Sequence, residues 1–177
     1  MPDRQPDPVI AMIFAAGRGS RMQPLSDTCP KPLLKVGGKA LIVWQIERLA
    51  AAGISTIIIN HAWLGQTIEA ALGNGDQWGV RLLYSPEIQA LETAGAIAQA
   101  RPLFDAYSKT CTFIATSGDI FTQYDYRVLI AQAYHMHQYT EPHMHLVMVP
   151  NPHYHPSGDF ALRGRAPADT IQPADQP

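Results

Sequence analysis

Stretches of apolar residues that suit buried strands alternate along this chain with stretches that suit amphipathic helices. Val9–Ala15 is a continuous apolar run of strand length, which is typical of a strand covered on both faces, as in a parallel sheet. Further strands are predicted at Thr56–Asn60, Val80–Tyr84, Cys111–Thr116 and His145–Val149. Helical spacing of apolar residues predicts helices at Leu41–Ala52, Leu64–Leu72, Gly95–Leu103 and Tyr126–His137.

This order of elements predicts an α/β fold. Strands that alternate with helices form βαβ crossovers, so the sheet should be mostly parallel, with helices on both faces. The pattern stops after Leu162, because Arg163–Pro177 contains a single large apolar residue, Ile171, among small and polar ones. We therefore expect one domain at 9–162 and a disordered tail at 163–177.

Composition narrows the class of protein. The 177 residues are 46% hydrophobic, which is enough for a folded core, and the formal net charge of −2 argues against a protein that coats nucleic acid. Val9–Ala16 is too short to cross a bilayer and no basic segment precedes it, while Cys29 and Cys111 form no CxxC motif. We expect a cytoplasmic protein with reduced thiols and no membrane or nucleic-acid partner; the oligomeric state stays open.

Three segments follow predicted strands at the edge where ligands bind. In open α/β sheets the ligand lies beyond the carboxyl ends of the strands. Gly17–Lys31 follows the first strand, Leu91–Gly95 the third, and Gly118-Asp119 the fourth. These segments are the candidates for a binding site.

The first of them opens with a glycine-rich turn. Gly17 and Gly19 let backbone N–H groups come close to a phosphate or a base, because glycine has no side chain. The dinucleotide-binding motif GxGxxG is not met, because Met22 stands at its third glycine. The Walker motif GxxxxGK[ST] is not met either, because Ala40 follows Gly38-Lys39.

Two cations flank this turn. Arg21 comes directly after it, and Lys31 lies ten positions further on, in Pro30-Lys31-Pro32. Two positive charges beside a glycine loop suit a triphosphate, whose charge they can neutralise as it shifts during a reaction. The alternative is a surface loop with ordinary solvated cations.

The same residues resemble a known family. The motif GxGxRMxPL at Gly17–Leu25, with PKPLL at Pro30–Leu34 and VxGKxL at Val36–Leu41, looks like the signature of the sugar-1-phosphate nucleotidylyltransferases. Leu91–Gly95 resembles the nucleobase-contacting segment of that family, and Ser117–Ile120 resembles its metal-binding (N/S)GD turn. The resemblance covers Val9–Leu162.

Finer features are similar to the bacterial N-acetylmuramate-1-phosphate uridylyltransferases, which serve cell-wall sugar recycling, that is, peptidoglycan recycling. They lie in Asn60–Gly65, Leu91–Thr93, Gly118–Asp125 and Asn151–Phe160. Relatives of those enzymes include mannose-1-phosphate guanylyltransferases, and the two groups are hard to separate by sequence. The guanylyltransferase therefore stays an alternative.

The resemblance implies a fold and a reaction. The fold would be a Rossmann-like, nucleotide-diphospho-sugar transferase (GT-A-like) sheet. The reaction would be Mg²⁺-dependent transfer of a nucleotidyl group from an NTP, with UTP favoured, to a sugar-1-phosphate, with N-acetylmuramate-1-phosphate favoured, giving an NDP-sugar and pyrophosphate. No protein nucleophile is needed, so positioning and charge neutralisation carry the catalysis.

The resemblance also implies roles for particular residues. Arg21 would hold the β- and γ-phosphates, Lys31 would bridge the α-phosphate and the sugar phosphate, and Asp119 would bind Mg²⁺. Nucleotide-binding positions would be Ala15, Ala16, Gly17, Gly19, Glu92, Thr93 and Gly95, and Asp159 would contact the sugar. Taken alone, Asp119 could equally be a turn aspartate after glycine.

The chain departs from the family at its end. Members usually continue past the GDFxL segment with more strands, part of the sugar pocket and a second metal-binding aspartate, and neither Asp169 nor Asp175 has that setting. We therefore expect a truncated or frameshifted product, a fragment, or a protein that has lost full activity. The hypothesis is that the nucleotide half of the site is kept while turnover is low or absent. The alternatives to an enzyme are an inactive nucleotide-binding module and an unstable remnant with an exposed sheet edge.

Two other features offer chemistry. The histidines pair up at 135 and 137, 143 and 145, and 153 and 155, and a strand would place His143 and His145 on one face, as a Zn²⁺ or Ni²⁺ pair requires. Solvated or hydrogen-bonded histidines are the plainer interpretation. Cys29, near Lys31, could be oxidised and so inhibit, or it is an ordinary loop cysteine.

Overall fold

The structure is a computed structural model that describes residues 7–136, 139, 141, 143–158, 160–162 and 171–173. The chain divides into two compact units, Met1–Gln138 and Tyr139–Pro177. The first unit holds the sheet with its helices, and the second holds a short antiparallel pair of strands, β7 (Phe160–Leu162) and β8 (Ile171–Pro173).

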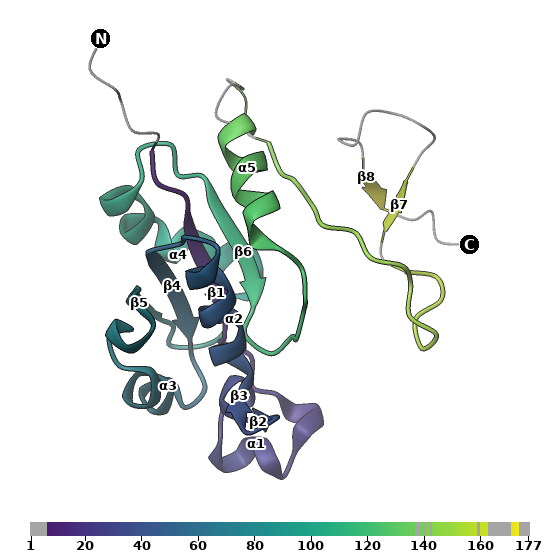
Figure 1. Cartoon of the computed structure of the whole chain (residues 1–177). Coiled ribbons are helices and arrows are strands. Elements are labelled where there is room, and N and C mark those ends of the chain that lie inside the picture. The colour runs from purple at the N-terminus through teal and green to yellow at the C-terminus, as the bar shows by residue number, and fades with distance from the viewer. Residues whose placement is uncertain are drawn as a thin grey trace. The chain divides into compact units, whose positions relative to one another are not determined.

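The first unit is built on a parallel sheet of four strands in the order β5-β4-β1-β6 (Figure 1). The strands are β1 (Ile10–Phe14), β4 (Thr56–His61), β5 (Arg81–Pro86) and β6 (Phe113–Ser117). Their ends lie within two residues of the predicted ones. All six residues of β4 are buried, as the continuous apolar run predicts for an inner strand of a parallel sheet.

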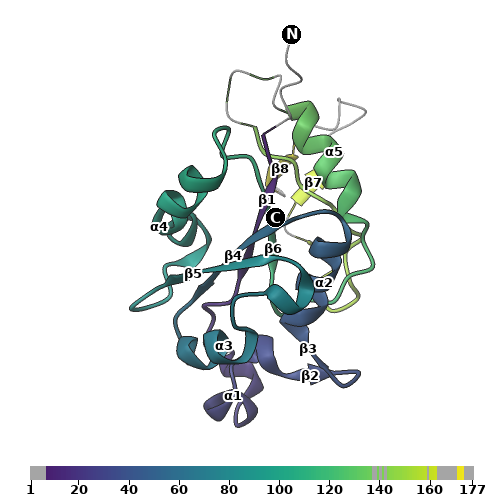
Figure 2. The ribbon, with the colours of Figure 1, turned by 60° about the vertical axis from the view of Figure 1, so that its left-hand side comes forward.

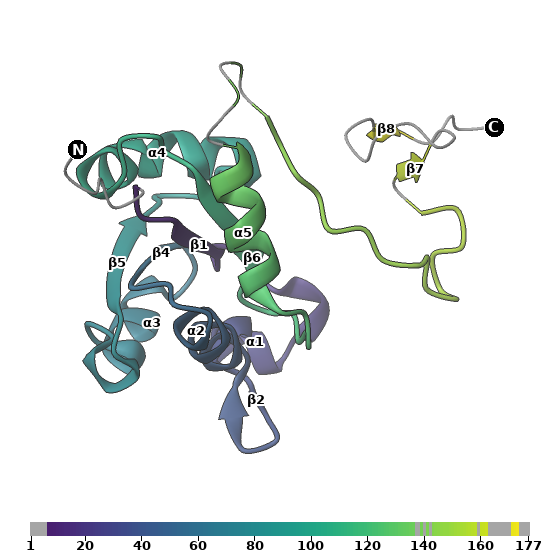
Figure 3. The same cartoon turned by 45° about the horizontal axis from the view of Figure 1, so that its top comes forward.

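Four longer helices connect and cover these strands: α2 (Leu41–Ala51), α3 (Gly65–Leu72), α4 (Glu92–Tyr107) and α5 (Tyr126–Met136). Successive residues of β1 point to opposite faces of the sheet. Ala11 and Ile13 pack in one core cluster with residues of α2, α3 and α5, whereas Ile10 and Met12 pack in the other with α4. Figures 2 and 3 show α4 across the sheet from α2 and α3, so helices cover both faces as predicted.

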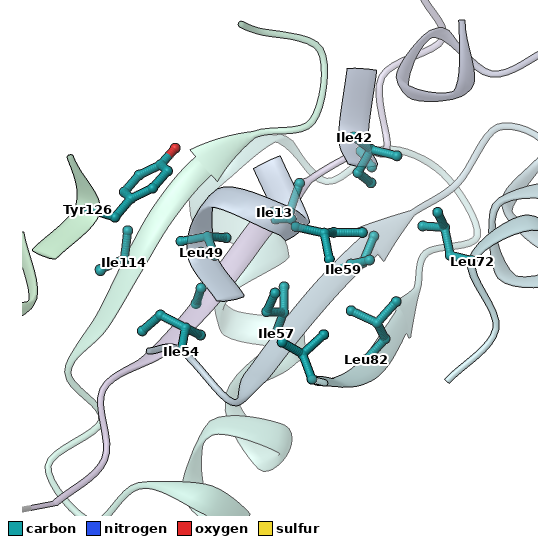
Figure 4. Close-up of a cluster of buried hydrophobic side chains, with 14 of the residues drawn as sticks. Ile13, Ile42, Leu49, Ile54, Ile57, Ile59, Leu72, Leu82, Ile114 and Tyr126 are labelled. Atoms are coloured by element: carbon teal, nitrogen blue, oxygen red, sulfur yellow. The ribbon is translucent and has the colours of Figure 1, made fainter. Parts of the chain in front are cut away.

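The larger of the two clusters is the main core. Its members come from β1, β4, β5 and β6 and from the helices on that face, and Figure 4 shows them meeting above the sheet. Ile13, Ile42, Leu49, Ile57 and Ile59 are 3% exposed or less. Burial of this apolar surface is the main favourable term in folding, at roughly 25 cal/mol per Å².

Short elements occupy the connections. The long segment between β1 and α2 contains η1 (Ser20–Met22), α1 (Leu25–Thr28), η2 (Lys31–Leu33) and a hairpin of β2 (Lys35–Val36) and β3 (Lys39–Ala40). A further turn of 3-10 helix, η3 (Asp76–Trp78), precedes β5. The segment that carries the glycine turn is therefore a folded insertion in a crossover connection.

One helix is longer than the sequence pattern predicts. α4 begins three residues before Gly95 and ends four residues after Leu103, with Pro102 inside it. Gly95 and Pro102 disfavour a helix, and the many alanines blur the apolar periodicity that would reveal one. The helix nevertheless forms because Ala96, Ala100 and Phe104 pack under the sheet.

The predicted strand at His145–Val149 is wrong, since these residues are neither helix nor strand. Val149 is 73% exposed. A strand exists only when it pairs with another one, and in the described part of the second unit only β7 and β8 pair. An apolar run indicates a preference for the extended conformation but not the presence of a partner.

The tail prediction falls mostly outside the described residues. Ile171–Pro173 forms β8 with β7, and the rest of 163–177 is not described, so the predicted disorder there stays a prediction.

Both cysteines are free thiols, as predicted. The thiol of Cys111 donates to a carboxylate oxygen of Asp105 at 2.9 Å, and this bond together with burial raises the pKa of Cys111. Among the described helices, none is long and apolar enough to cross a membrane.

Asp7 fastens the start of β1 to the segment after α4, and this contact predicts a pH effect. Its carboxylate accepts hydrogen bonds of 2.8 Å from the hydroxyl of Ser108 and from the backbone N–H and hydroxyl of Thr110. Burial raises the pKa of Asp7, but the bonds from Thr110 and Ser108 outweigh it and hold the pKa well below its usual range. The stabilisation is present above the unfolded pKa of ~3.9 and is lost as the pH falls below it.

We expect Asp7→Asn to lower the free energy of unfolding at pH 7, and its difference from the wild type to shrink between about pH 4 and pH 2. Urea unfolding at several pH values measures this difference. Asp76→Asn, at the start of η3, is the control. A difference that stays constant over this pH range would contradict the role of Asp7.

Candidate active site

A cavity of about 330 Å³ opens at the carboxyl ends of the strands. Nine of the eleven predicted site residues line it: Ala15, Ala16, Gly17, Gly19, Arg21, Lys31, Glu92, Thr93 and Asp119. Gly95 lies in α4, where an added β-carbon would lie 2.8 Å from the side chain of Leu91, and it is not among the lining residues. Asp159 lies outside the described residues. The structure thus brings three distant segments together, while the role of each residue stays a prediction.

The glycine turn leaves room beside its first glycine. An added β-carbon on Gly17 would meet no atom within 4 Å, so this side of the turn is open. Gly19 has φ of +66°, a left-handed conformation that favours glycine, and its carbonyl accepts a bond of 2.8 Å from the buried hydroxyl of Ser26. The turn is therefore held from below and open toward the cavity.

The two arginines of the turn have different surroundings. Arg18 pairs with Asp27 at 2.9 Å and lies 3.6 Å from the centre of the Trp63 ring, so its charge is already engaged. Among the described residues, no carboxylate pairs with Arg21, which lines the cavity. The cation available to an anionic ligand is therefore Arg21.

Lys31 and Asp119 form an ion pair at the cavity. The Lys31 Nζ lies 2.6 Å from Oδ2 of Asp119, and each side chain is about one third exposed (30% and 33%). The pair joins η2 to the turn after β6, 88 positions apart. The end of β1 fixes the turn that carries Asp119. The Gly118 N–H donates to the Phe14 carbonyl at 2.9 Å, and an added β-carbon on Gly118 would come within 3.1 Å of the Ile13 side chain.

A buried polar network supports the turn that carries Asp119. Gln45 of α2 is fully buried, donates to the Ile120 carbonyl at 2.7 Å and accepts from the Tyr126 hydroxyl at 2.6 Å. The Tyr126 hydroxyl also lies 3.1 Å from the Thr116 hydroxyl. Burial raises the pKa of Tyr126, which keeps its phenol protonated and able to donate. This network was not predicted from the sequence, although a glutamine on the apolar face of a helix is a detectable signal.

Glu92 has an unusual backbone conformation. It begins α4, lines the cavity and has φ of +59°. A non-glycine residue in the left-handed region costs of order 1–3 kcal/mol and is found most often where surrounding structure holds a functional turn. The backbone at the start of α4 is thus strained at the edge of the cavity.

The structure bears on the histidine alternative, while the oxidation of Cys29 stays a prediction. No group of three or more potential metal-binding side chains occurs in the described residues. The expected strand face shared by His143 and His145 is absent, and the ring of His143 lies 2.6 Å from the Glu141 carbonyl and stacks on Tyr139. His137 lies outside the described residues, and Cys29 is a half-buried loop thiol.

Comparisons with known proteins show the family of this chain. The family model described as nucleotidyl transferase matches residues 10–156. The chain is 48% identical over 164 residues (92% of this chain, 67% of the relative) to an N-acetylmuramate alpha-1-phosphate uridylyltransferase of Neisseria meningitidis. It is 43% identical over 99 residues (54% and 41%) to the protein of that name in Caulobacter vibrioides, and 35% identical over 123 residues (68% and 33%) to a mannose-1-phosphate guanyltransferase of Neurospora crassa.

Solved structures agree on the fold. HddC of Yersinia pseudotuberculosis, complexed with GMP-PN, matches with a TM-score of 0.60 and 26% identity over 71% of this chain and 54% of its own. The CTP:phosphocholine cytidylyltransferase of Streptococcus pneumoniae matches with a TM-score of 0.50 and 28% identity over 67% and 48%. The chain thus spans between a third and two thirds of the length of these proteins. It has the Rossmann-like fold of the nucleotide-diphospho-sugar transferases and belongs to the nucleotidyl transferase family of enzymes.

Proposed function

We propose that this chain transfers a nucleotidyl group from a nucleoside triphosphate to a sugar-1-phosphate, with UTP and N-acetylmuramate-1-phosphate as the favoured substrates. The observation that carries the proposal is the meeting of Arg21, Lys31 and Asp119 at one cavity with an open glycine turn. The names of the relatives in Neisseria and Caulobacter support the choice of base and sugar. A cytoplasmic role in cell-wall sugar recycling is part of the same proposal.

The chemistry follows from charge and position. The phosphate oxygen of the sugar-1-phosphate attacks the α-phosphorus of the nucleotide in line, and pyrophosphate leaves with the bonding electrons. Arg21 lies where it can neutralise the leaving pyrophosphate. Lys31 can hold the α-phosphate and the attacking phosphate together, which removes much of the entropy cost of their encounter. The chain needs no covalent intermediate of its own.

The residues present fit a Mg²⁺ ion as part of this proposal. Asp119 offers one hard carboxylate oxygen at the cavity, and proteins often bind Mg²⁺ through one or two carboxylates together with substrate phosphates. Such an ion, when bound, supplies positive charge that stabilises the phosphate oxygens. Asp119 is the residue that would hold it, with Lys31 as its partner before a nucleotide arrives.

A mannose-1-phosphate guanylyltransferase is the second candidate, because the Neurospora relative bears that name and HddC was crystallised with GMP-PN. A nucleotide-binding module with little or no turnover is the third. The chain aligns with 67% of the Neisseria relative, so turnover must be measured separately from binding.

One prediction from this proposal concerns catalysis. Pyrophosphate release from UTP, N-acetylmuramate-1-phosphate and Mg²⁺ should fall by roughly 10²–10³ in Arg21→Gln, because one group that stabilises developing charge is removed. Asp119→Asn should lose activity to a similar degree. Arg127→Gln, which removes an exposed arginine paired with Asp125, is the control and should keep wild-type activity. Full activity in Arg21→Gln would rule out the proposed site, and binding without release would favour the inactive module.

Another prediction concerns the base of the nucleotide. UTP at 100 times its Kd should stabilise the chain by about 2.7 kcal/mol. At ~2–4 °C per kcal/mol this raises the melting temperature by about 5–10 °C. A thermal-shift panel of UTP, GTP, CTP, ATP and dTTP measures the preference, and a larger shift with GTP would favour the guanylyltransferase.

A further prediction concerns the ion pair of Lys31 and Asp119. In Lys31→Met the carboxylate of Asp119 loses its partner, so Mn²⁺ should bind the nucleotide-free chain more tightly, by up to about fivefold for a partly exposed pair worth ~1 kcal/mol or less. The same variant should bind UTP more weakly. Electron paramagnetic resonance of free Mn²⁺ measures the first effect without turnover. Equal or weaker Mn²⁺ binding in Lys31→Met than in the wild type would exclude competition between the ammonium group and the metal.

A further inference from the structure

A chain of three hydrogen bonds, two of them buried, joins the two walls of the cavity. Ala15 and Asn60 line one wall, at the ends of β1 and β4, while Ala90, Glu92 and Thr93 line the other, at the start of α4. The connection between these walls is made by the side chains of Asn60 and Glu87.

Three hydrogen bonds make up this connection, which we call the relay. The Ala15 N–H donates to Oδ1 of Asn60 at 3.1 Å, and Nδ2 of Asn60 donates to Oε1 of Glu87 at 2.8 Å. The Leu91 N–H donates to Oε2 of Glu87 at 2.9 Å. The backbone of Glu87 is itself fixed, because its N–H donates to the His61 carbonyl at the end of β4 at 2.8 Å.

The relay is an unusual use of a charged residue. Asn60 is 3% exposed and Glu87 is 6% exposed, and no cation pairs with Glu87 in the part of the chain that the structure describes. A buried carboxylate is costly unless hydrogen bonds satisfy it. Both of its oxygens are used to hold backbone or amide N–H groups at the cavity, and one of these N–H groups precedes the strained Glu92.

We propose that Asn60 and Glu87 are positioning residues that set the distance and orientation between the two walls that receive the nucleobase. The inference rests on the proposed nucleotide site and deepens it. Ala15, Ala90, Glu92 and Thr93 line the cavity, and a base held between the two walls can be read only if the separation of the walls is fixed. Arg21 and Lys31, at the phosphate end, line the same cavity and take part in none of these three hydrogen bonds.

The polarity of the relay provides a sharp test. Asn60→Asp alone sets two carboxylates against each other. Glu87→Gln alone leaves a pair of donors facing each other, whichever way the two amides are turned. The double variant Asn60→Asp with Glu87→Gln satisfies all three bonds again, since Asp accepts from Ala15 and from the Gln amide, and Gln accepts from Leu91.

Calorimetry of the whole chain with UTP and with pyrophosphate, without sugar and without turnover, separates the two ends of the site. Each single variant should raise the Kd for UTP about tenfold or more, since a buried group loses its partner. Each should also bring the Kd values for UTP and GTP closer together and leave the Kd for pyrophosphate unchanged. The double variant should return to within a few-fold of the wild type.

Three outcomes would overturn the proposal: single variants with wild-type UTP affinity, a double variant as weak as the two losses combined, or equal losses for UTP and pyrophosphate. If a single variant does not fold, Glu87→Asp, which keeps the charge but shortens the reach, replaces it, with the same expected loss for UTP alone. A wild-type chain that binds no nucleotide would instead overturn the proposed function and the inference with it, so the two failures are distinguishable.

Discussion

The cavity depends on one constraint, the burial of β1 on both faces in the middle of a parallel sheet. Ile10 and Met12 are covered by α4, and Ala11 and Ile13 are covered from the other side. A ligand can therefore reach β1 only at the ends of the strand. Parallel pairing with β4 and β6 then brings the carboxyl ends of three strands to one edge. The glycine turn, Asn60 and Asp119 all follow from that convergence.

Charge at this edge is arranged locally and not by composition. A net charge of −2 gives no hint of an anion site. The cavity nevertheless has Arg21 without a carboxylate partner among the described residues, and Lys31 whose ammonium group is held by Asp119. Arg18, next to the turn, is engaged by Asp27 and Trp63. Three cations within a short segment therefore differ in their ion-pair partners, because the fold places different neighbours beside each of them.

Polar groups placed inside the core give the site its rigidity. Gln45 and Tyr126 hold the turn after Asp119 from below, and Asn60 and Glu87 join the walls of the cavity. Each such group would be costly in an apolar interior without a partner, and each has one. Such groups favour a single geometry of the loops above them, since any displacement breaks a buried hydrogen bond.

The sequence by itself determined the strands of the sheet, the two-sided covering by helices and the segments that line the cavity, because periodicity and glycine turns are local signals of burial and backbone conformation. Tertiary structure decided the rest. Pairing across 88 positions made Lys31 the partner of Asp119, packing under the sheet extended α4 through Pro102, and the absence of a described partner strand left His145–Val149 unpaired. Asn60 opens one of the segments that resemble the family, but nothing in the sequence pairs it with Glu87, and only the approach of β4 to the segment before α4 joins them. A contact between residues that are distant in the sequence forms only in the folded chain, so no local pattern predicts it.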